Sequence, residues 1–162
     1  GRGANWVDPT YGPVSATTHL GEGLIAVYGS DPAGHPEHAW KVVREEETAG
    51  PGLFLKTHPK SNHIWTDSTL SKEEGVNQEI CVFRKDDFAA GANCGKAPDH
   101  GKAVHVEDNK AGDEVWAAGW DKKGELIVYD DKTLKEKTRI TGDWLVTPTG
   151  KWNVYNTVND VY

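Results

Sequence analysis

A short pattern recurs three times along this 162-residue chain: strand-forming residues, a polar turn, and a second strand with an aromatic side chain. The copies span Lys56–Trp65, Val106–Trp116 and Thr147–Tyr155. In the third copy, Pro148 removes a backbone donor and Gly150 permits a sharp reversal. Helical periodicity is almost absent, and short apolar clusters separated by Gly, Pro, Asn and Asp are typical of strands joined by turns. The chain therefore predicts an all-β fold.

The apolar clusters also predict where the strands lie. They fall at Leu24–Tyr28, Ala39–Val43, Leu53–Thr57, His63–Thr66, Ile80–Phe83, Ala103–Val106, Val115–Ala118, Leu126–Tyr129 and Leu145–Thr147. A further strand, Lys151–Tyr155, would follow the turn of the third copy. The run Glu45–Glu47 is interpreted as a solvated loop, and Phe88–Lys102, which lacks a clear pattern, as another loop.

The spacing of the repeat indicates a particular all-β architecture. Trp65 and Trp116 occupy matching places in two copies, one repeat apart. Blades of a β-propeller have four strands and repeat at about 40–50 residues, so the chain holds about three blades. A complete propeller needs at least about four, and three alone would leave open edges. Residues 1–162 are therefore predicted to form a partial β-propeller, a fragment of one larger propeller domain.

Composition excludes several classes of function. The formal net charge of −7 argues against nucleic-acid binding, which needs clustered Lys and Arg. No apolar run approaches the ~20 residues of a membrane span. The chain begins at Gly1 without Met or an apolar leader, so we expect it to start inside a longer protein. The lack of a leader therefore carries no information about location.

Cys81 and Cys94 are the only cysteines. No Cys-x-x-Cys-His motif is present, so no c-type haem is attached within this chain. We expect two independent thiols, one in a strand and one in a loop; the alternative is a mutual disulfide, which an oxidising compartment would allow. His35 and His38 fall in a Gly-Pro loop and not on a helix face, so no metal site is expected.

Nearly the whole chain resembles the C-terminal part of the haem d1 domain of cytochrome cd1 nitrite reductases, and only Phe88–Lys102 departs widely. The matching stretches occur in family order with similar spacing. They are Gly1–Asn5, Tyr11–Val14, Thr18–Gly21, Asp31–Pro36, Leu53–Ser61, Gly112–Trp116, Val128–Leu134 and Thr147–Thr157.

The resemblance implies an eight-bladed propeller that carries haem d1 and reduces nitrite to nitric oxide. Electrons would come from a c-haem domain that is not in this chain, supplied in turn by a small protein such as a cytochrome c or a cupredoxin. The family's parent proteins are periplasmic homodimers. The family's catalytic histidines lie upstream of the position of Gly1, so no catalytic residue is expected here and the chain alone is expected to be inactive.

The resemblance also assigns cofactor-binding residues. Arg2 matches an arginine that pairs with a haem d1 carboxylate, a role that suits a planar guanidinium. Phe54 and Trp120 match pocket aromatics, although both residue types are also common in a plain core. Thr149 and Gly150 match a Thr-Gly turn beside the haem face, and an ordinary turn would need the glycine as well.

His105 is where the chain departs from the resemblance, because the family members compared carry Gln there. Either side chain can hydrogen-bond an anion or a haem substituent, and His can also titrate near neutral pH or ligate iron. A role over the haem pocket and a structural role both stay open. Two other functions are also open: a paralogue that binds or matures haem d1 without reducing nitrite, and a propeller used only as an interaction scaffold.

Overall fold

The computed structural model describes residues 3–154, which fold almost entirely into antiparallel sheet. Within this range the helices are three single turns of 3-10 type: η1 (Val76–Gln78), η2 (Phe88–Ala90) and η3 (Asp143–Leu145). None of the helices in residues 3–154 is long and apolar enough to cross a membrane.

Three four-stranded sheets follow one another along the chain, and in each the strands pair in sequence order. Blade 1 contains β1 (Ala4–Asp8), β2 (Gly12–Thr18), β3 (Leu24–Gly29) and β4 (Val42–Glu47). Blade 2 contains β5 (Leu55–Lys56), β6 (His63–Asp67), β7 (Glu79–Arg84) and β8 (Asn93–Lys96). Blade 3 contains β9 (Lys102–Asp108), β10 (Glu114–Trp120), β11 (Glu125–Asp130) and β12 (Glu136–Thr141).

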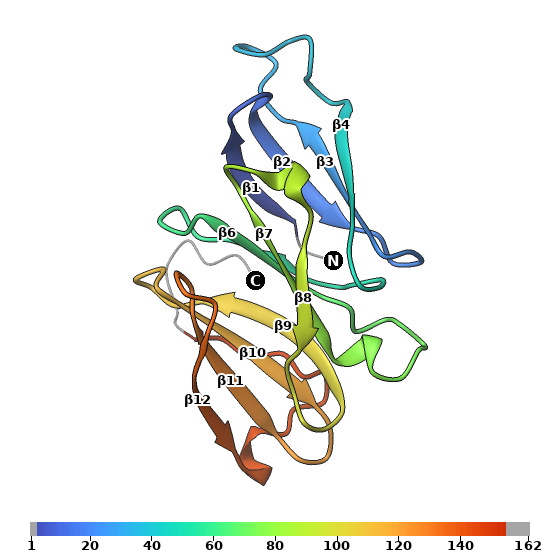
Figure 1. The fold of residues 1–162 in the computed structure, drawn as a ribbon, viewed down its shortest axis with the longest axis vertical. Helices are drawn as coiled ribbons and strands as arrows, with labels where there is room; N and C mark the ends of the chain where they lie inside the picture. Colours follow the sequence, from blue (N-terminus) through green and yellow to red (C-terminus); the bar gives the residue numbers. More distant parts are fainter. Residues whose placement is uncertain (1–2, 155–162) are drawn as a thin grey trace.

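The blades are stacked face to face, with blade 2 between the other two (Figure 1). Successive meanders of four strands that pack on one another are the architecture of a β-propeller. The expectation of an all-β fold with about three blades of a propeller is confirmed.

Two apolar layers hold the blades together. Between blades 1 and 2, Trp6 stacks on Phe88 at 5.4 Å between ring centroids, and Phe88 stacks on Phe83 at 4.5 Å. Between blades 2 and 3, Trp65 packs against Tyr129 with centroids 5.5 Å apart. Burial of such large aromatic and aliphatic side chains supplies most of the driving force for packing sheets together.

A buried polar anchor joins blades 2 and 3 as well. Trp65 Nε1 donates to Asp131 Oδ1 at 3.0 Å, and Ser61 Oγ donates to Asp131 Oδ2 at 2.6 Å. Trp65 therefore contributes both apolar area and a hydrogen bond to the interface, which explains the first of the recurring tryptophans.

Several strands, most of them at the edges of the blades, were predicted poorly. Glu45–Glu47, expected to be a loop, form the end of β4, and the predicted strand Ala39–Val43 begins only at Val42. The expected strand Leu53–Thr57 is reduced to Leu55–Lys56. The sequence also missed β1, β2 and β12. An outer strand such as β4 or β12 is largely exposed, so its charged residues resemble those of a loop.

Two further expectations were wrong in the last third of the chain. Leu145–Thr147 is not a strand, because Leu145 ends η3 and the following residues run without strand pairing through Val154. The strand expected at Lys151–Tyr155 is therefore absent over its described part, and Tyr155 lies outside the described residues. The segment is held by side-chain packing instead: Trp152 lies against Trp116 with ring centroids 5.5 Å apart.

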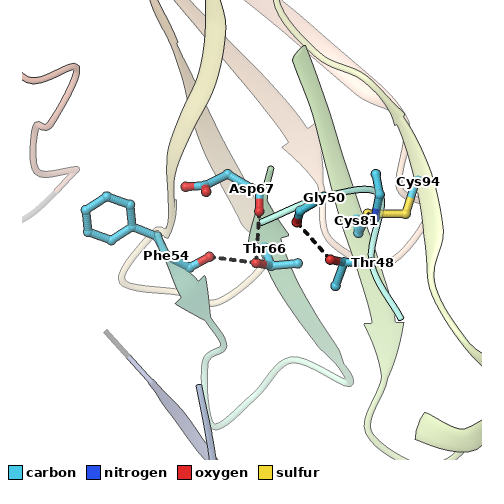
Figure 2. The surroundings of a disulfide bond; sticks show 8 residues. Thr48, Gly50, Phe54, Thr66, Asp67, Cys81 and Cys94 are labelled. Atoms are coloured by element: carbon cyan, nitrogen blue, oxygen red, sulfur yellow. Dashed lines mark hydrogen bonds between the residues drawn. A yellow bond between two sulfur atoms is a disulfide. The ribbon is translucent and has the colours of Figure 1, made fainter. Parts of the chain in front are cut away.

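The region Phe88–Lys102 is more ordered than a plain loop, and it contains a disulfide. It includes η2, β8 and the fully buried ring of Phe88. Cys81 on β7 and Cys94 on β8 are direct partners in the strand register and are joined by an S–S bond (Figure 2). The expectation of two independent thiols was wrong, because a strand that the sequence did not reveal places Cys94 opposite Cys81.

Candidate functional site

The described site residues come from separate elements and gather on one face of the blade 2–blade 3 junction. Phe54 precedes β5, His105 lies on β9, Trp120 ends β10, and Thr149 and Gly150 follow η3. We call this set the site face. Arg2, the remaining expected ligand, lies outside the described residues.

His105 sits in a β-bulge. The β9–β10 register pairs Ala117 with Val106 and Ala118 with Val104, which leaves His105 as the extra residue between them. Its φ of 58° is in the left-handed region, which costs an L-residue roughly 1–2 kcal/mol. Bulges of this kind redirect a side chain and frequently lie next to functional sites.

A buried carboxylate holds the bulge. Asp67, at the end of β6 and 1% exposed, accepts the backbone N–H of His105 through Oδ2 at 3.0 Å. Its Oδ1 accepts the N–H of Leu53 at 2.8 Å, immediately before Phe54. Figure 2 shows the Asp67 carboxylate on the side of β6 where Phe54 lies, away from the disulfide. Burial raises the pKa of Asp67 to about 6, and the N–H bonds from Leu53 and His105 partly oppose that rise.

The imidazole of His105 is fully buried and is held on both sides. Nδ1 accepts the backbone N–H of Trp152 at 3.4 Å, and Nε2 lies 3.3 Å from Glu107 Oε2. Lys56 Nζ is 3.6 Å from the other oxygen of Glu107. The ring of Phe54 meets the imidazole edge-to-face with centroids 4.8 Å apart. His105 is thus the buried member of the site face and supports the segment that carries Gly150.

Gly150 makes the close approach of that segment possible. Its φ is +68°, and a Cβ there would lie 2.5 Å from Val104 Cγ1 and 3.0 Å from Trp120. Only glycine fits such a backbone without strain and clash. Lys151 then places its ammonium 5.4 Å from the centroid of the Phe54 ring, within range of a cation–π contact.

The outer part of the site face is open. Trp120 is 38% exposed and lines a hollow of about 310 Å³ with Val146 and Thr147. A second hollow of about 370 Å³ is also lined by Thr147, together with Trp116 and Trp152. Exposed aromatic surface, a lysine ammonium and a glycine turn together suit a flat apolar ligand that carries negative groups.

Buried charges continue below this face. Asp108, 5% exposed, has its pKa raised to about 7, chiefly by burial and secondly by the nearby charge of Asp131. Burial likewise lowers the pKa of Lys85, whose Nζ donates to the carbonyl oxygens of His58 and Ser61 at 2.9 and 2.8 Å. Among residues 3–154, no three His, Cys, Asp or Glu side chains gather as a metal site.

The sequence missed four residues that build this face: Asp67, Glu107, Lys151 and Trp152. Lys151 and Trp152 belong to the third copy of the repeat, so their proximity to Gly150 was a usable signal. Asp67 and Glu107 end or follow apolar strand residues and resemble ordinary strand-end carboxylates. The role of Asp67 depends on a contact with His105, 38 residues later in the chain. The role of Glu107 depends on the orientation of the His105 imidazole, which the bulge sets.

Comparison with known proteins places this arrangement in a family. A model described as "Cytochrome D1 heme domain" matches residues 1–157. The chain is 46% identical to nitrite reductase of Stutzerimonas stutzeri, covering all of this chain and 32% of the relative. It is 33% identical to dihydro-heme d1 dehydrogenase of Pseudomonas aeruginosa, over 90% of this chain and 27% of the relative. The chain thus spans about a third of the length of these relatives.

Solved structures agree. The dihydro-heme d1 dehydrogenase NirN in complex with DHE matches 86% of this chain and 27% of its own, with a TM-score of 0.71 and 30% identity. The β-propeller domain of the trilobed protease from Pyrococcus furiosus matches 80% of this chain and 38% of its own, with a TM-score of 0.50; at 14% identity it speaks for the fold alone. The family model and the 46% identical relative both cover essentially the entire chain, and the chain belongs to the cytochrome d1 heme domain family.

Proposed function

We propose that this chain is the C-terminal part of the haem d1 propeller of a nitric-oxide-forming nitrite reductase. The observation that carries the proposal is the 46% identity to a nitrite reductase over the whole chain, against 33% over 90% of the chain for the dehydrogenase. When bound, haem d1 would supply the iron at which nitrite is reduced.

The site face would form one side of the cofactor pocket. Trp120, 38% exposed, would offer aromatic surface that packs on a macrocycle, and Phe54, only 8% exposed, would mainly exclude water from the pocket. The Gly150 turn lets the backbone approach a flat ligand, with Thr149 beside it as a hydroxyl donor. Arg2 would pair with a carboxylate of the cofactor. His105 would act through the Trp152 amide, and not by direct contact, because its ring is fully buried.

The rest of the activity would depend on other parts of the protein. We propose that the proton-donating histidines lie before the position of Gly1, as the resemblance implies, so we expect this chain alone to reduce no nitrite. We further propose that the electrons reach haem d1 from a c-haem domain, that the donor is a small cytochrome c or cupredoxin, and that the protein is a periplasmic homodimer. The Cys81–Cys94 disulfide supports an oxidising compartment.

A second candidate function is oxidation or maturation of haem d1 without nitrite reduction. It is favoured by the structural match to the dihydro-heme d1 dehydrogenase, and by His105 at a position where the resemblance to nitrite reductases implies Gln. A propeller scaffold without cofactor is the third candidate.

Titration of the full-length protein with haem d1, followed by its visible spectrum, tests all three. We expect binding, and then nitric oxide release on addition of nitrite and a reductant. Binding without nitric oxide release would favour the maturation enzyme, and it would do so most clearly if dihydro-haem d1 were oxidised. If the protein binds no haem d1, the function that remains is a propeller scaffold without cofactor. The isolated chain, mixed with haem d1, nitrite and a reductant, should release no nitric oxide; release from it would contradict the assignment of the catalytic residues to upstream positions.

A further inference from the structure

We propose that Asp67 is a positioning residue for the haem d1 face: its carboxylate fixes the His105 bulge and the Leu53–Phe54 backbone together, and so sets the distance between Phe54 and the Gly150 segment. This inference rests on the proposed function, because it concerns the same site. It adds a residue that lies outside the set suggested by the resemblance and that touches no ligand itself.

The first step is the bridging geometry of the carboxylate. The two oxygens of Asp67 accept N–H groups from different blades: Leu53 N, which leads into blade 2, and His105 N on β9 of blade 3. The distance from Leu53 N to Asp67 Oδ1 is 2.8 Å, and that from His105 N to Asp67 Oδ2 is 3.0 Å. Asp67 is 1% exposed. Because one rigid carboxylate accepts both N–H groups, the backbone at Leu53 and the backbone at His105 are held at a fixed separation.

The second step is that the bulge needs this partner. The N–H of His105 points out of the β9–β10 ladder, because the residue is the extra one in the register and has a positive φ. A buried N–H without an acceptor is strongly unfavourable. Asp67 supplies the acceptor, so the left-handed conformation of His105 depends on it.

The third step connects the bulge to the ligand side. The bulge turns the imidazole so that Nδ1 receives the Trp152 N–H, two residues after Gly150. The same imidazole packs edge-to-face on Phe54. A change in the bulge therefore moves both walls of the site face, Phe54 directly and Gly150 through Trp152.

Asp67→Asn tests the proposal in the full-length protein. Asn has the same shape but a single acceptor oxygen, so it can accept Leu53 N–H or His105 N–H and not both. We expect the Kd for haem d1 to rise about tenfold and the visible band of the bound cofactor to shift. If Asp67→Asn does not fold, Asp67→Ser provides a second variant, with a small hydroxyl that can accept one of the two N–H groups.

Asp8→Asn is the matched control. Asp8 is also a buried aspartate, 4% exposed, and its Oδ1 accepts two backbone N–H groups, from Thr10 at 2.8 Å and Tyr11 at 3.0 Å. Asp8 ends β1, in blade 1. Asp8→Asn removes a buried carboxylate but keeps an oxygen that can accept both N–H groups, so haem d1 affinity should stay within about twofold of wild type and the visible band should be unchanged.

A spectroscopic measurement on the wild-type protein provides a test that needs no Asp67 variant. The His105 amide resonance should follow the ionisation of Asp67, whose pKa is about 6. The imidazole could move the same resonance, so the measurement is repeated in His105→Gln, which keeps the amide and removes that titration. The titratable side chains on the strands that adjoin β6 are Lys56 on β5, Glu79 and Arg84 on β7, and Lys102, His105, Glu107 and Asp108 on β9.

The outcomes separate this inference from the proposed function. If wild-type protein binds no haem d1, both fail. If wild type binds and Asp67→Asn binds equally well with the same spectrum, the positioning role is refuted and the proposed function stands. An Asp8→Asn variant that weakens binding as much as Asp67→Asn would also refute the role, because the loss of any buried carboxylate would then explain both effects. If the backbone amide resonance of residue 105 does not titrate in His105→Gln, the proposed hydrogen bond between this amide and Asp67 is refuted.

Discussion

The disulfide gives the sharpest prediction about the fold. β8 is an exposed strand at the outer edge of blade 2, and it pairs only with β7. Cys94 ties it to the buried Cys81 across a sequence separation of 13 residues. Loss of the link in Cys94→Ser should therefore make β8 open more readily, whereas the buried sulfur of Cys81 can still accept the Ala49 N–H.

The magnitude follows from chain entropy. Closing a loop of this size stabilises the closed state by about 3 kcal/mol. If all of that applies to local opening of β8, its backbone amides should exchange with solvent roughly 100-fold faster in Cys94→Ser than in wild type. The assay is hydrogen exchange of the full-length protein at fixed pH, followed for peptides that cover 93–96 and, for comparison, β9.

A matched control and a clear refutation exist. Asn93→Ser changes the neighbouring exposed residue on β8 and keeps the disulfide, so its exchange should resemble that of wild type. Treatment of wild type with a reductant should reproduce the effect of Cys94→Ser. If β8 exchanges within twofold of wild type after loss of the link, the edge strand is held by its ladder and by packing on blade 3, and the reasoning from chain entropy is wrong here.

Three further predictions concern other parts of the molecule. Gly150→Val should cost about 1–3 kcal/mol, since it combines a positive φ with a clash against Val104, and a urea midpoint equal to wild type would contradict this. Asp108 has a pKa raised to about 7, so the folded state holds this proton more tightly than the unfolded state and stability should fall as pH rises from about 4 to 7. Across that window the free energy of unfolding of wild type should fall by an amount on the order of 4 kcal/mol, and Asp108→Asn should remove this fall. The free energy of unfolding is measured by urea denaturation at pH 4.5 and pH 8, and an equal change between these pH values in both proteins would refute the prediction. Trp65→Phe should cost about 1–3 kcal/mol, because Asp131 loses a buried donor, and an unchanged thermal midpoint would argue against that anchor.

Most central strands were visible in the sequence, because burial on both faces selects apolar residues, although β2 in blade 1 was missed. Strands β6, β7, β10 and β11 each contain a cluster predicted from the sequence, and the repeated tryptophans correctly indicated the blade length. The family likewise followed from short stretches in a fixed order, because these stretches are local in sequence. Such features survive in a linear pattern, since each depends on the burial or turn chemistry of neighbouring residues.

Apart from the buried edge strand β9, which contains the predicted cluster Ala103–Val106, the edge strands and the site geometry have no such local signature. β8 is exposed at all four residues, so nothing in its composition distinguishes it from a loop, and the pairing of Cys94 with Cys81 depends on its register. The last segment was expected to pair as a strand, but it packs through Trp152 and the His105 imidazole instead.

The bulge at His105 illustrates the physical reason. Periodicity places His105 on a strand, and resemblance places it near a cofactor, but neither indicates that its N–H leaves the ladder. That N–H is satisfied by Asp67, 38 residues earlier in the chain, and the imidazole by Trp152, 47 residues later. Local patterns record which residues are buried, whereas the partners of a buried polar group depend on how blades 2 and 3 meet in three dimensions, and only the folded chain specifies that contact.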